Sequence, residues 1–257
     1  MAFSQLLLLF CVAILAGTLN SVAGGGSFFT VPTMIFSGIL PVLANTTSTL
    51  GLWTGTAASL GAYRRELAQV RLKLMILLVS TSLIGGILGA ILLLHTPQKT
   101  FVVLLPYLLL ISILLFTFSG PITKRLHARN IEEQANLSLM AIISVSVAQF
   151  IISIYGGYFG GGAGMLMLAT LALMGMENIH SMNALKSLLG ASINGVAVIT
   201  FIIANAIVWP QAISMIIGAV IGGYGGGYFA RKIEPQWIRY FVMVVGFAMT
   251  IYFFICS

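Results

Sequence analysis

Two apolar segments of this chain are too long for one membrane-spanning helix, yet too apolar for a soluble fold. Residues 5–37 and 137–175 are 33 and 39 residues long, whereas about 20 residues at a rise of 1.5 Å each cross a bilayer core. Each is interrupted by glycines, Gly24–Gly26 in the first and "GGYFGGGAG" over 156–164 in the second. Because glycine weakens a helix by about 0.5–1 kcal/mol relative to alanine, we expect each segment to form a broken helical hairpin.

Six further segments are unbroken and have the length of a single membrane span. The chain is 59% hydrophobic and 7% charged, whereas an ordinary soluble domain carries about 25% charged residues. Helices are favoured because a helix in lipid satisfies its own backbone hydrogen bonds. We therefore predict an all-α, polytopic helical membrane protein, a single domain over 1–257 in the lipid bilayer. The predicted spans are 41–62, 74–94, 100–119, 181–204, 211–230 and 237–256.

The two halves of the chain repeat one another. Gly24–Gly26 and Gly160–Gly162 are 136 residues apart, and the same offset relates Gly86 to Gly222 and Gly89 to Gly225. Agreement of separate glycine features on one offset indicates a duplicated unit. We predict repeat one over 1–119, a polar linker over 120–136 and repeat two over 137–257, each repeat a broken hairpin followed by three spans.

The basic residues decide between two topologies. If each broken segment crosses the membrane once, the loop Lys and Arg residues divide seven to four; if each is a hairpin, they divide ten to one. The positive-inside rule favours the hairpins. The second repeat is then inverted, both termini lie outside, and the basic loops are cytoplasmic. The expected location is the cell membrane, the inner one in a Gram-negative cell. The ten residues are Arg64, Arg65, Arg71, Lys73, Lys124, Arg125, Arg129, Arg231, Lys232 and Arg239, against Lys99.

The glycine breaks are the first candidate for a binding site. Irregular backbone at membrane depth is tolerated only where protein buries it or where it lines a watered cavity. Half-helices beginning near Ser27 and Gly164 would present free N–H groups and a partial positive charge, which suit an anion. In the alternative interpretation, the glycines merely permit tight turns and close helix packing.

Polar side chains follow each break inside the next span. Asn45, Thr47 and Ser48 follow the first break, and Asn183, Lys186 and Asn194 follow the second. Together they can line a polar path or hydrogen-bond between helices, although a single Ser or Thr often bonds to its own helix. Lys186 is either the counter-ion of an anionic solute or a snorkelling residue, about 9 Å from the cytoplasmic end at 1.5 Å per residue.

Other chemistry lacks support in the sequence. No carboxylate lies in a predicted span, and neither a metal-ligand cluster nor a phosphate-binding loop is present. We therefore expect no enzyme activity, cofactor or metal. The net charge of +7 is explained by the basic loops, and no nucleic-acid-binding motif accompanies it. Glu177 and His180 follow the second hairpin; we interpret them as solvated loop residues, with relay of a coupling proton as the alternative.

Three segments resemble the sulfite exporter TauE/SafE family: "NSVAGGGSFFTVPTMIFSGILPVLANTTSTLG" at 20–51, "IYGGYFGGGAGMLMLATLALMG" at 154–175 and "NALKSLLGASINGVAVITF" at 183–201. The resemblance implies an integral membrane transporter of two homologous halves and about eight transmembrane helices. Several members are linked to export or uptake of sulfur-containing anions such as sulfite or sulfonates. Ser48 stands where many members have Asn.

The sequence thus predicts a secondary transporter that moves a small, sulfur-containing anion (sulfite, thiosulfate or an organosulfonate) by alternating access, with a proton as candidate coupling ion. The alternatives are a transporter of the same fold for a metal ion or neutral metabolite, or a non-transporting membrane assembly factor. The predicted solute-binding residues are Gly24, Gly25, Gly26, Ser27, Asn45, Thr47, Ser48, Gly160, Gly161, Gly162, Gly164, Asn183, Lys186 and Asn194.

Overall fold

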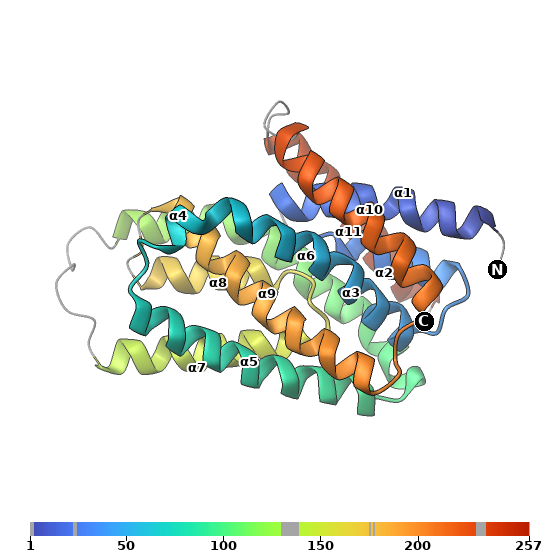
Figure 1. Cartoon of the computed structure of the whole chain (residues 1–257), viewed down its shortest axis with the longest axis horizontal. Coiled ribbons are helices and arrows are strands. Elements are labelled where there is room, and N and C mark those ends of the chain that lie inside the picture. The colour runs from blue at the N-terminus through green and yellow to red at the C-terminus, as the bar shows by residue number, and fades with distance from the viewer. Residues whose placement is uncertain are drawn as a thin grey trace.

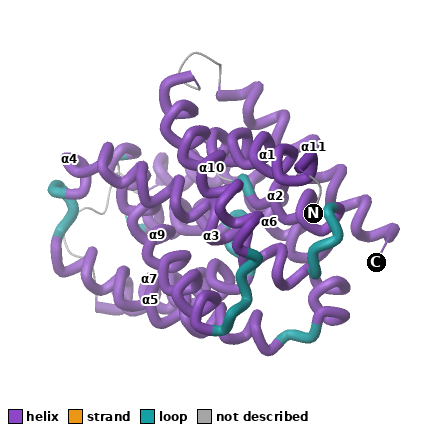
Figure 2. Tube along the Cα trace, turned by 45° about the vertical axis from the view of Figure 1, so that its right-hand side comes forward, coloured by secondary structure: helices purple, strands orange, loops and turns teal. Residues whose placement is uncertain are grey.

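The computed structural model describes residues 3–22, 25–129, 139–174, 176, 178–229 and 235–256. Over these residues the chain is helical, without a strand (Figure 2), which confirms the predicted all-α class. The elements are α1 (Phe3–Val22), α2 (Ser27–Phe36), α3 (Pro41–Ser59), η1 (Leu60–Tyr63), α4 (Arg64–Leu67), α5 (Leu72–His95), α6 (Gln98–Arg129), α7 (Leu139–Tyr158), α8 (Ala163–Leu173), α9 (Ile179–Ile203), α10 (Trp209–Phe229) and α11 (Pro235–Cys256).

Both segments that were predicted to be broken consist of two helices. The first divides into α1 and α2, and the second into α7 and α8. In the second break Gly160 and Gly162 have φ values of +81° and +74°. These lie in the left-handed region, where glycine is tolerated and other residues are strained. The sequence therefore breaks the helix where its backbone must adopt this conformation.

The six unbroken spans correspond to α3, α5, α6, α9, α10 and α11. Pro41 and Pro235 are the first residues of their helices, where the missing N–H of proline leaves no intrahelical bond unmade. Helix α6 extends into the predicted linker 120–136 as far as Arg129, and residues 130–138 lie outside the described part.

Three helices of the described chain are long and apolar enough on their own to cross a bilayer: Leu72–His95, Gln98–Thr117 and Ser181–Ile203. Shorter apolar helices cover Ser4–Asn20, Ser27–Phe36, Ile143–Tyr158, Ala163–Ala172 and Tyr240–Ile255.

The two halves pack against each other through equivalent pairs of helices. Figure 1 shows α5 beside α7, and α1 packs along α10 in the same way. The repeat relates α1 to α7 and α5 to α10. The contact of α1 with α10 is therefore the equivalent, under the repeat, of the contact of α7 with α5. The pairs α3–α10 and α9–α5, and α2–α11 and α8–α6, correspond in the same manner. The inversion of repeat two relative to the membrane stays a prediction.

The offset of 136 also fixes the register of these crossings. A Cβ on Gly218 would lie 2.9 Å from Cβ of Ala13, and Nε2 of Gln149 donates to Oγ of Ser82 at 2.8 Å. Ala13 and Gln149 are related by the offset, as are Ser82 and Gly218. One crossing is thus a close small-residue contact, and its counterpart is a buried hydrogen bond, both of which hold helices together in membranes.

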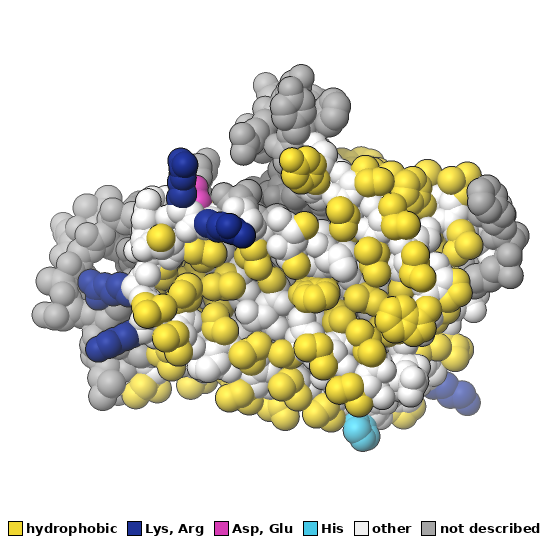
Figure 3. Space-filling model, in the orientation of Figure 1, with side chains coloured by type: hydrophobic (Ala, Val, Ile, Leu, Met, Phe, Trp, Pro, Cys, Tyr) yellow, Lys and Arg dark blue, Asp and Glu magenta, His cyan; other side chains and the backbone are white. Residues whose placement is uncertain are grey.

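Charge gathers at the two ends of the molecule. In Figure 3 most of the Lys and Arg side chains lie at the end where α4 is found, and apolar side chains cover the surface between the ends. Arg64 and Arg65 belong to α4, while Arg71 and Lys73 lie at the start of α5. Helix α1 begins and α11 ends toward the opposite end (Figure 1), where Lys99 lies in the first turn of α6. We call these the α4 end and the far end.

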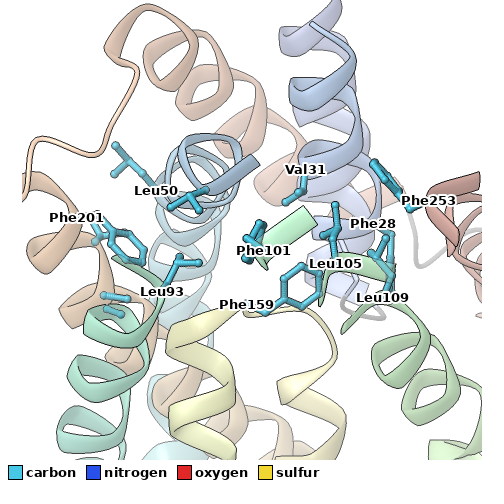
Figure 4. Packing of buried hydrophobic residues seen from close by; sticks show 14 of the residues in the cluster. Phe28, Val31, Leu50, Leu93, Phe101, Leu105, Leu109, Phe159, Phe201 and Phe253 are labelled. Atoms are coloured by element: carbon cyan, nitrogen blue, oxygen red, sulfur yellow. The ribbon is translucent and has the colours of Figure 1, made fainter. Parts of the chain in front are cut away.

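The largest core cluster joins both halves. Phe28 of α2, Phe101 of α6, Phe159 at the second break and Phe201 of α9 are all buried in it (Figure 4). The glycine breaks are therefore held by packing between the repeats.

Candidate functional site: a cavity between the two halves

A cavity of about 110 Å³ lies between the two repeats and is lined by both. Among the described residues, six polar side chains line it, and Lys186 is the charged one of these six. Of the five acidic residues of the chain, Glu66 belongs to the part that the structure describes, and it does not line the cavity. The polar residues are Asn20, Thr56, Tyr63, Lys186, Ser187 and Asn194, and the glycines of the lining are Gly17, Gly25, Gly55, Gly156, Gly160, Gly162, Gly164 and Gly190.

One face of α9 forms a wall of this cavity. Lys186, Gly190 and Asn194 follow one another at intervals of four residues, so they share a face of the helix. A Cβ on Gly190 would meet no heavy atom within 4 Å, whereas Oδ1 of Asn194 lies 3.9 Å from the Cβ position of Gly160. The wall therefore carries a cation at one end, an amide at the other and open space between them.

The start of α8 faces the lysine. Cδ of Lys186 lies 3.4 Å from the position of a Cβ on Gly164, so the aliphatic stem of the lysine runs over the first turn of α8. The N-cap of α8 is Gly162, and no side chain caps this helix end. The first N–H groups of a helix have no intrahelical partner, and they carry partial positive charge. The ammonium group and the helix end thus combine two sources of positive potential.

The first repeat contributes neutral polar groups. Nδ2 of Asn20 in α1 donates to Oγ1 of Thr56 in α3 at 3.1 Å. Tyr63, the last residue of η1, lines the cavity and is half-buried, so the cavity reaches toward the α4 end. Amide and hydroxyl groups of this kind can hydrogen-bond an oxyanion without adding charge.

The far end is filled by apolar side chains. Phe116 of α6 lines the cavity, and the helix begins at Gln98 near the far end. Between them Phe101, Leu105, Leu109 and Ile113 are fully buried. The cavity is thus separated from the far end by a packed core.

Six of the predicted site residues meet in the cavity: Gly25, Gly160, Gly162, Gly164, Lys186 and Asn194. Gly24 lies outside the described residues. Gly26 packs against the carbonyl of Ala16, and the carbonyl of Gly161 accepts a hydrogen bond from Oγ of Ser112 at 2.8 Å. Ser27 begins α2, and Asn183 lies on α9, both away from the lining.

The predicted polar residues of α3 also lie away from the cavity and bridge other elements. Nδ2 of Asn45 donates to the carbonyl of Tyr158 at 2.9 Å. Oγ1 of Thr47 accepts from the amide of Val208 at 3.1 Å, and Ser48 shares a 2.6 Å hydrogen bond with Thr30. In this conformation their role is to join helices.

The lining also contains residues that were not predicted as site residues, among them Asn20, Thr56, Tyr63 and Gly190. Gly190 could have been found, because it stands midway between Lys186 and Asn194 at helical spacing. Asn20 directly precedes the first break. Thr56 of α3 and Tyr63 of η1 carry no such signal, since only tertiary packing brings them to the cavity.

Comparison with known proteins follows this geometry. A family model described as "Sulfite exporter TauE/SafE" matches residues 9–253. The chain belongs to this family. It is 29% identical to a probable membrane transporter protein, ORF9, of Sinorhizobium sp, over 98% of this chain and 93% of the relative. Identity to a probable membrane transporter protein of Haemophilus influenzae is 27%, over 95% and 92%.

A third TauE/SafE relative is the probable membrane transporter protein YfcA of Escherichia coli K12, 28% identical over 94% of this chain and 87% of the relative. No solved structure matches the chain. Family membership, the names of the relatives and the apolar helices together support a membrane-embedded transporter, and they confirm the family resemblance.

Proposed function

We propose that this protein is a secondary transporter of a small anion, with sulfite, thiosulfate or a small organosulfonate as the solute. The observation that carries the proposal is the charge of the cavity: Lys186 lines it, and no carboxylate of the described residues does. The side chain of Lys186 is half-buried, and a cation that loses part of its contact with water needs a partner of opposite charge. An anionic solute supplies the missing partner, and charge-assisted hydrogen bonds from the lysine and a helix N-terminus bind oxyanions well.

The size of the cavity favours a small solute. Its volume of about 110 Å³ is well below the range of about 300–1,000 Å³ typical of sites for drug-sized ligands. Such a space accommodates several waters or one small polyatomic ion. A bulky organic anion requires the walls to move apart.

Transport would proceed by alternating access between two inverted repeats. Transporters of this plan bind their solute at the repeat interface, beside discontinuous helices. The cavity lies beside the second break and Gly25, reaches toward the α4 end and is closed toward the far end by the α6 core. Rocking of the repeats would close the α4 end and open the far end.

We further propose that the protein lies in the cell membrane, with the α4 end in the cytoplasm and both termini outside. A single cysteine at Ala68, next to α4, should then react with an impermeant thiol reagent from the cytoplasmic side only. A cysteine at Gln98 should react from outside only. The native Cys11 and Cys256 are replaced by serine in both chains, and the opposite pattern of labelling contradicts the orientation.

The decisive experiment for the solute is uptake into proteoliposomes. Radiolabelled sulfite, thiosulfate and ethanesulfonate are offered to the purified protein, beside a labelled divalent cation and a neutral amino acid. We expect saturable flux of at least one anion and none of the cation. An imposed pH gradient tests the proton as coupling ion by changing the accumulated level. A folded protein that carries none of the anions contradicts the proposal, and carriage of the cation or amino acid would replace it.

A further inference from the structure

Gly190 occupies an unusual place in the cavity. It lies between Lys186 and Asn194 on the same face of α9, and all three line the cavity. A Cβ at this position would meet no heavy atom within 4 Å. Most helical glycines at the repeat interface differ, because a Cβ on Gly86, Gly89, Gly218 or Gly222 would overlap the neighbouring helix. Packing therefore does not require glycine at position 190.

Helix stability does not explain this glycine either. Glycine in a helix interior is less favourable than alanine, and Gly190 stands in the middle of α9 (Ile179–Ile203). Alanine here would strengthen the helix and touch nothing in the protein. What it would occupy is the open space between the ammonium group of Lys186 and the amide of Asn194.

We propose that Gly190 is the floor of the solute site and sets the size limit of the transported anion. This inference rests on the proposed function. The anionic group lies between Lys186 and the start of α8, where both positive sources converge. The remainder of the solute, an oxygen atom for sulfite or a short carbon chain for an organosulfonate, lies over Gly190 and reaches toward Asn194.

Solute selectivity then depends on the side chain at position 190. A single methyl group too many in a fitted site changes discrimination by about 10–200-fold. Alanine at position 190 reduces the open space between Lys186 and Asn194 and leaves the lysine in place. The larger organosulfonate should therefore lose more than the compact inorganic ion, and leucine should exclude both.

The test compares Gly190→Ala and Gly190→Leu with the matched substitutions Gly225→Ala and Gly225→Leu in proteoliposomes. Gly225 is also a helical glycine with no heavy atom within 4 Å of its Cβ position, and it lies outside the cavity lining. We expect Gly190→Ala to lower ethanesulfonate flux about tenfold or more and to leave sulfite flux near the wild-type value. Gly190→Leu should abolish both fluxes, and both Gly225 variants should transport normally.

A second measurement is independent of any solute. Gly190→Cys and Gly225→Cys are made in a chain carrying Cys11→Ser and Cys256→Ser, and each is exposed to a small charged methanethiosulfonate in detergent. Position 190 should react because it faces a watered cavity, and position 225, which lies outside the cavity lining, serves as the comparison.

The outcomes separate the two proposals. If the wild type carries no anion but Gly190→Cys reacts, the cavity stands and the proposed solute is wrong. If the wild type carries an anion while Gly190→Leu transports it normally, or if Gly190→Cys does not react, the assignment of Gly190 as the floor is overturned.

Discussion

The aliphatic stem of Lys186 lies against Gly164, with Cδ of the lysine 3.4 Å from the place where a Cβ would stand. This contact joins a span of the second repeat to the first turn of the half-helix α8. It positions Lys186, the cation among the described residues of the lining, beside a helix N-terminus that no side chain caps. The most direct consequences concern these two residues.

Lys186→Gln removes the charge and leaves a side chain of similar length. Hydrogen bonds to charged groups contribute about 1.5–3 kcal/mol, so we expect the apparent affinity for the transported anion to fall about 10–100-fold. Lys186→Arg keeps the charge and should retain part of the affinity. The concentration dependence of flux measures both. Equal affinity in wild type and Lys186→Gln would show that the lysine only snorkels.

Gly164→Ala places a methyl group in ordinary contact with the lysine stem, and transport should change little. Gly164→Val adds two methyl groups that the stem must avoid, so the ammonium group should move and the apparent affinity should fall. The comparison is made by flux in the same liposomes, with melting in detergent as the control for folding. A valine variant that melts normally and transports like wild type would show that the contact is incidental.

The second break offers a test of backbone strain. Gly160→Ala and Gly162→Ala both force alanine into the left-handed region, at a cost of roughly 1–2 kcal/mol. A Cβ on Gly162 would also lie 3.1 Å from Cα of Ser112, whereas Gly160 has no neighbour closer than 3.5 Å. We expect both variants to melt at lower temperature in detergent, and Gly162→Ala to be the less stable. The reverse order would contradict the packing of the break against α6.

The crossing of α1 and α10 offers a test of helix packing. A Cβ on Gly222 would overlap the carbonyl of Ile14, and Gly225 one turn on has open space. Forcing an extra methyl into a packed interface costs about 1–3 kcal/mol. Gly222→Ala should therefore lower the melting temperature, and Gly225→Ala should not. If the two variants melt alike, the helices are not in the close contact described here.

The all-α class could be predicted from the sequence because long apolar segments favour helices in a membrane, whereas the inversion of the second repeat stays a prediction. The two broken segments were found from the cost of consecutive glycines. The offset of 136 residues predicted a duplicated unit, and the packing of α1 on α10 and of α7 on α5 is consistent with it. The extension of α6 to Arg129 was not predicted, because polarity was taken as the mark of a linker, whereas polar residues can continue a helix beyond the membrane.

Apart from Gly25, the residues of the cavity that the sequence predicted belong to the second half of the chain. Lys186 and Asn194 stand out as polar residues in an apolar helix, and Gly160 to Gly164 as a break. Asn45, Thr47 and Ser48 have the same signal, yet they hydrogen-bond to other parts of the protein. The sequence shows that a residue is polar. Only the structure shows whether its side chain points into a cavity or toward a neighbouring helix.

A small anion is proposed to occupy the cavity beside Lys186. Ser187 lines the same cavity, so Ser187→Cys in a chain with Cys11→Ser and Cys256→Ser places a thiol next to the site. The rate of its reaction with a small methanethiosulfonate is measured in the presence of sulfite, thiosulfate or ethanesulfonate, with Arg65→Cys on α4 as the surface control. We predict that the anion which the protein carries slows the reaction at position 187 in a saturable manner and leaves position 65 unchanged. An unchanged rate at position 187, in a protein that transports the same anion, would contradict the account.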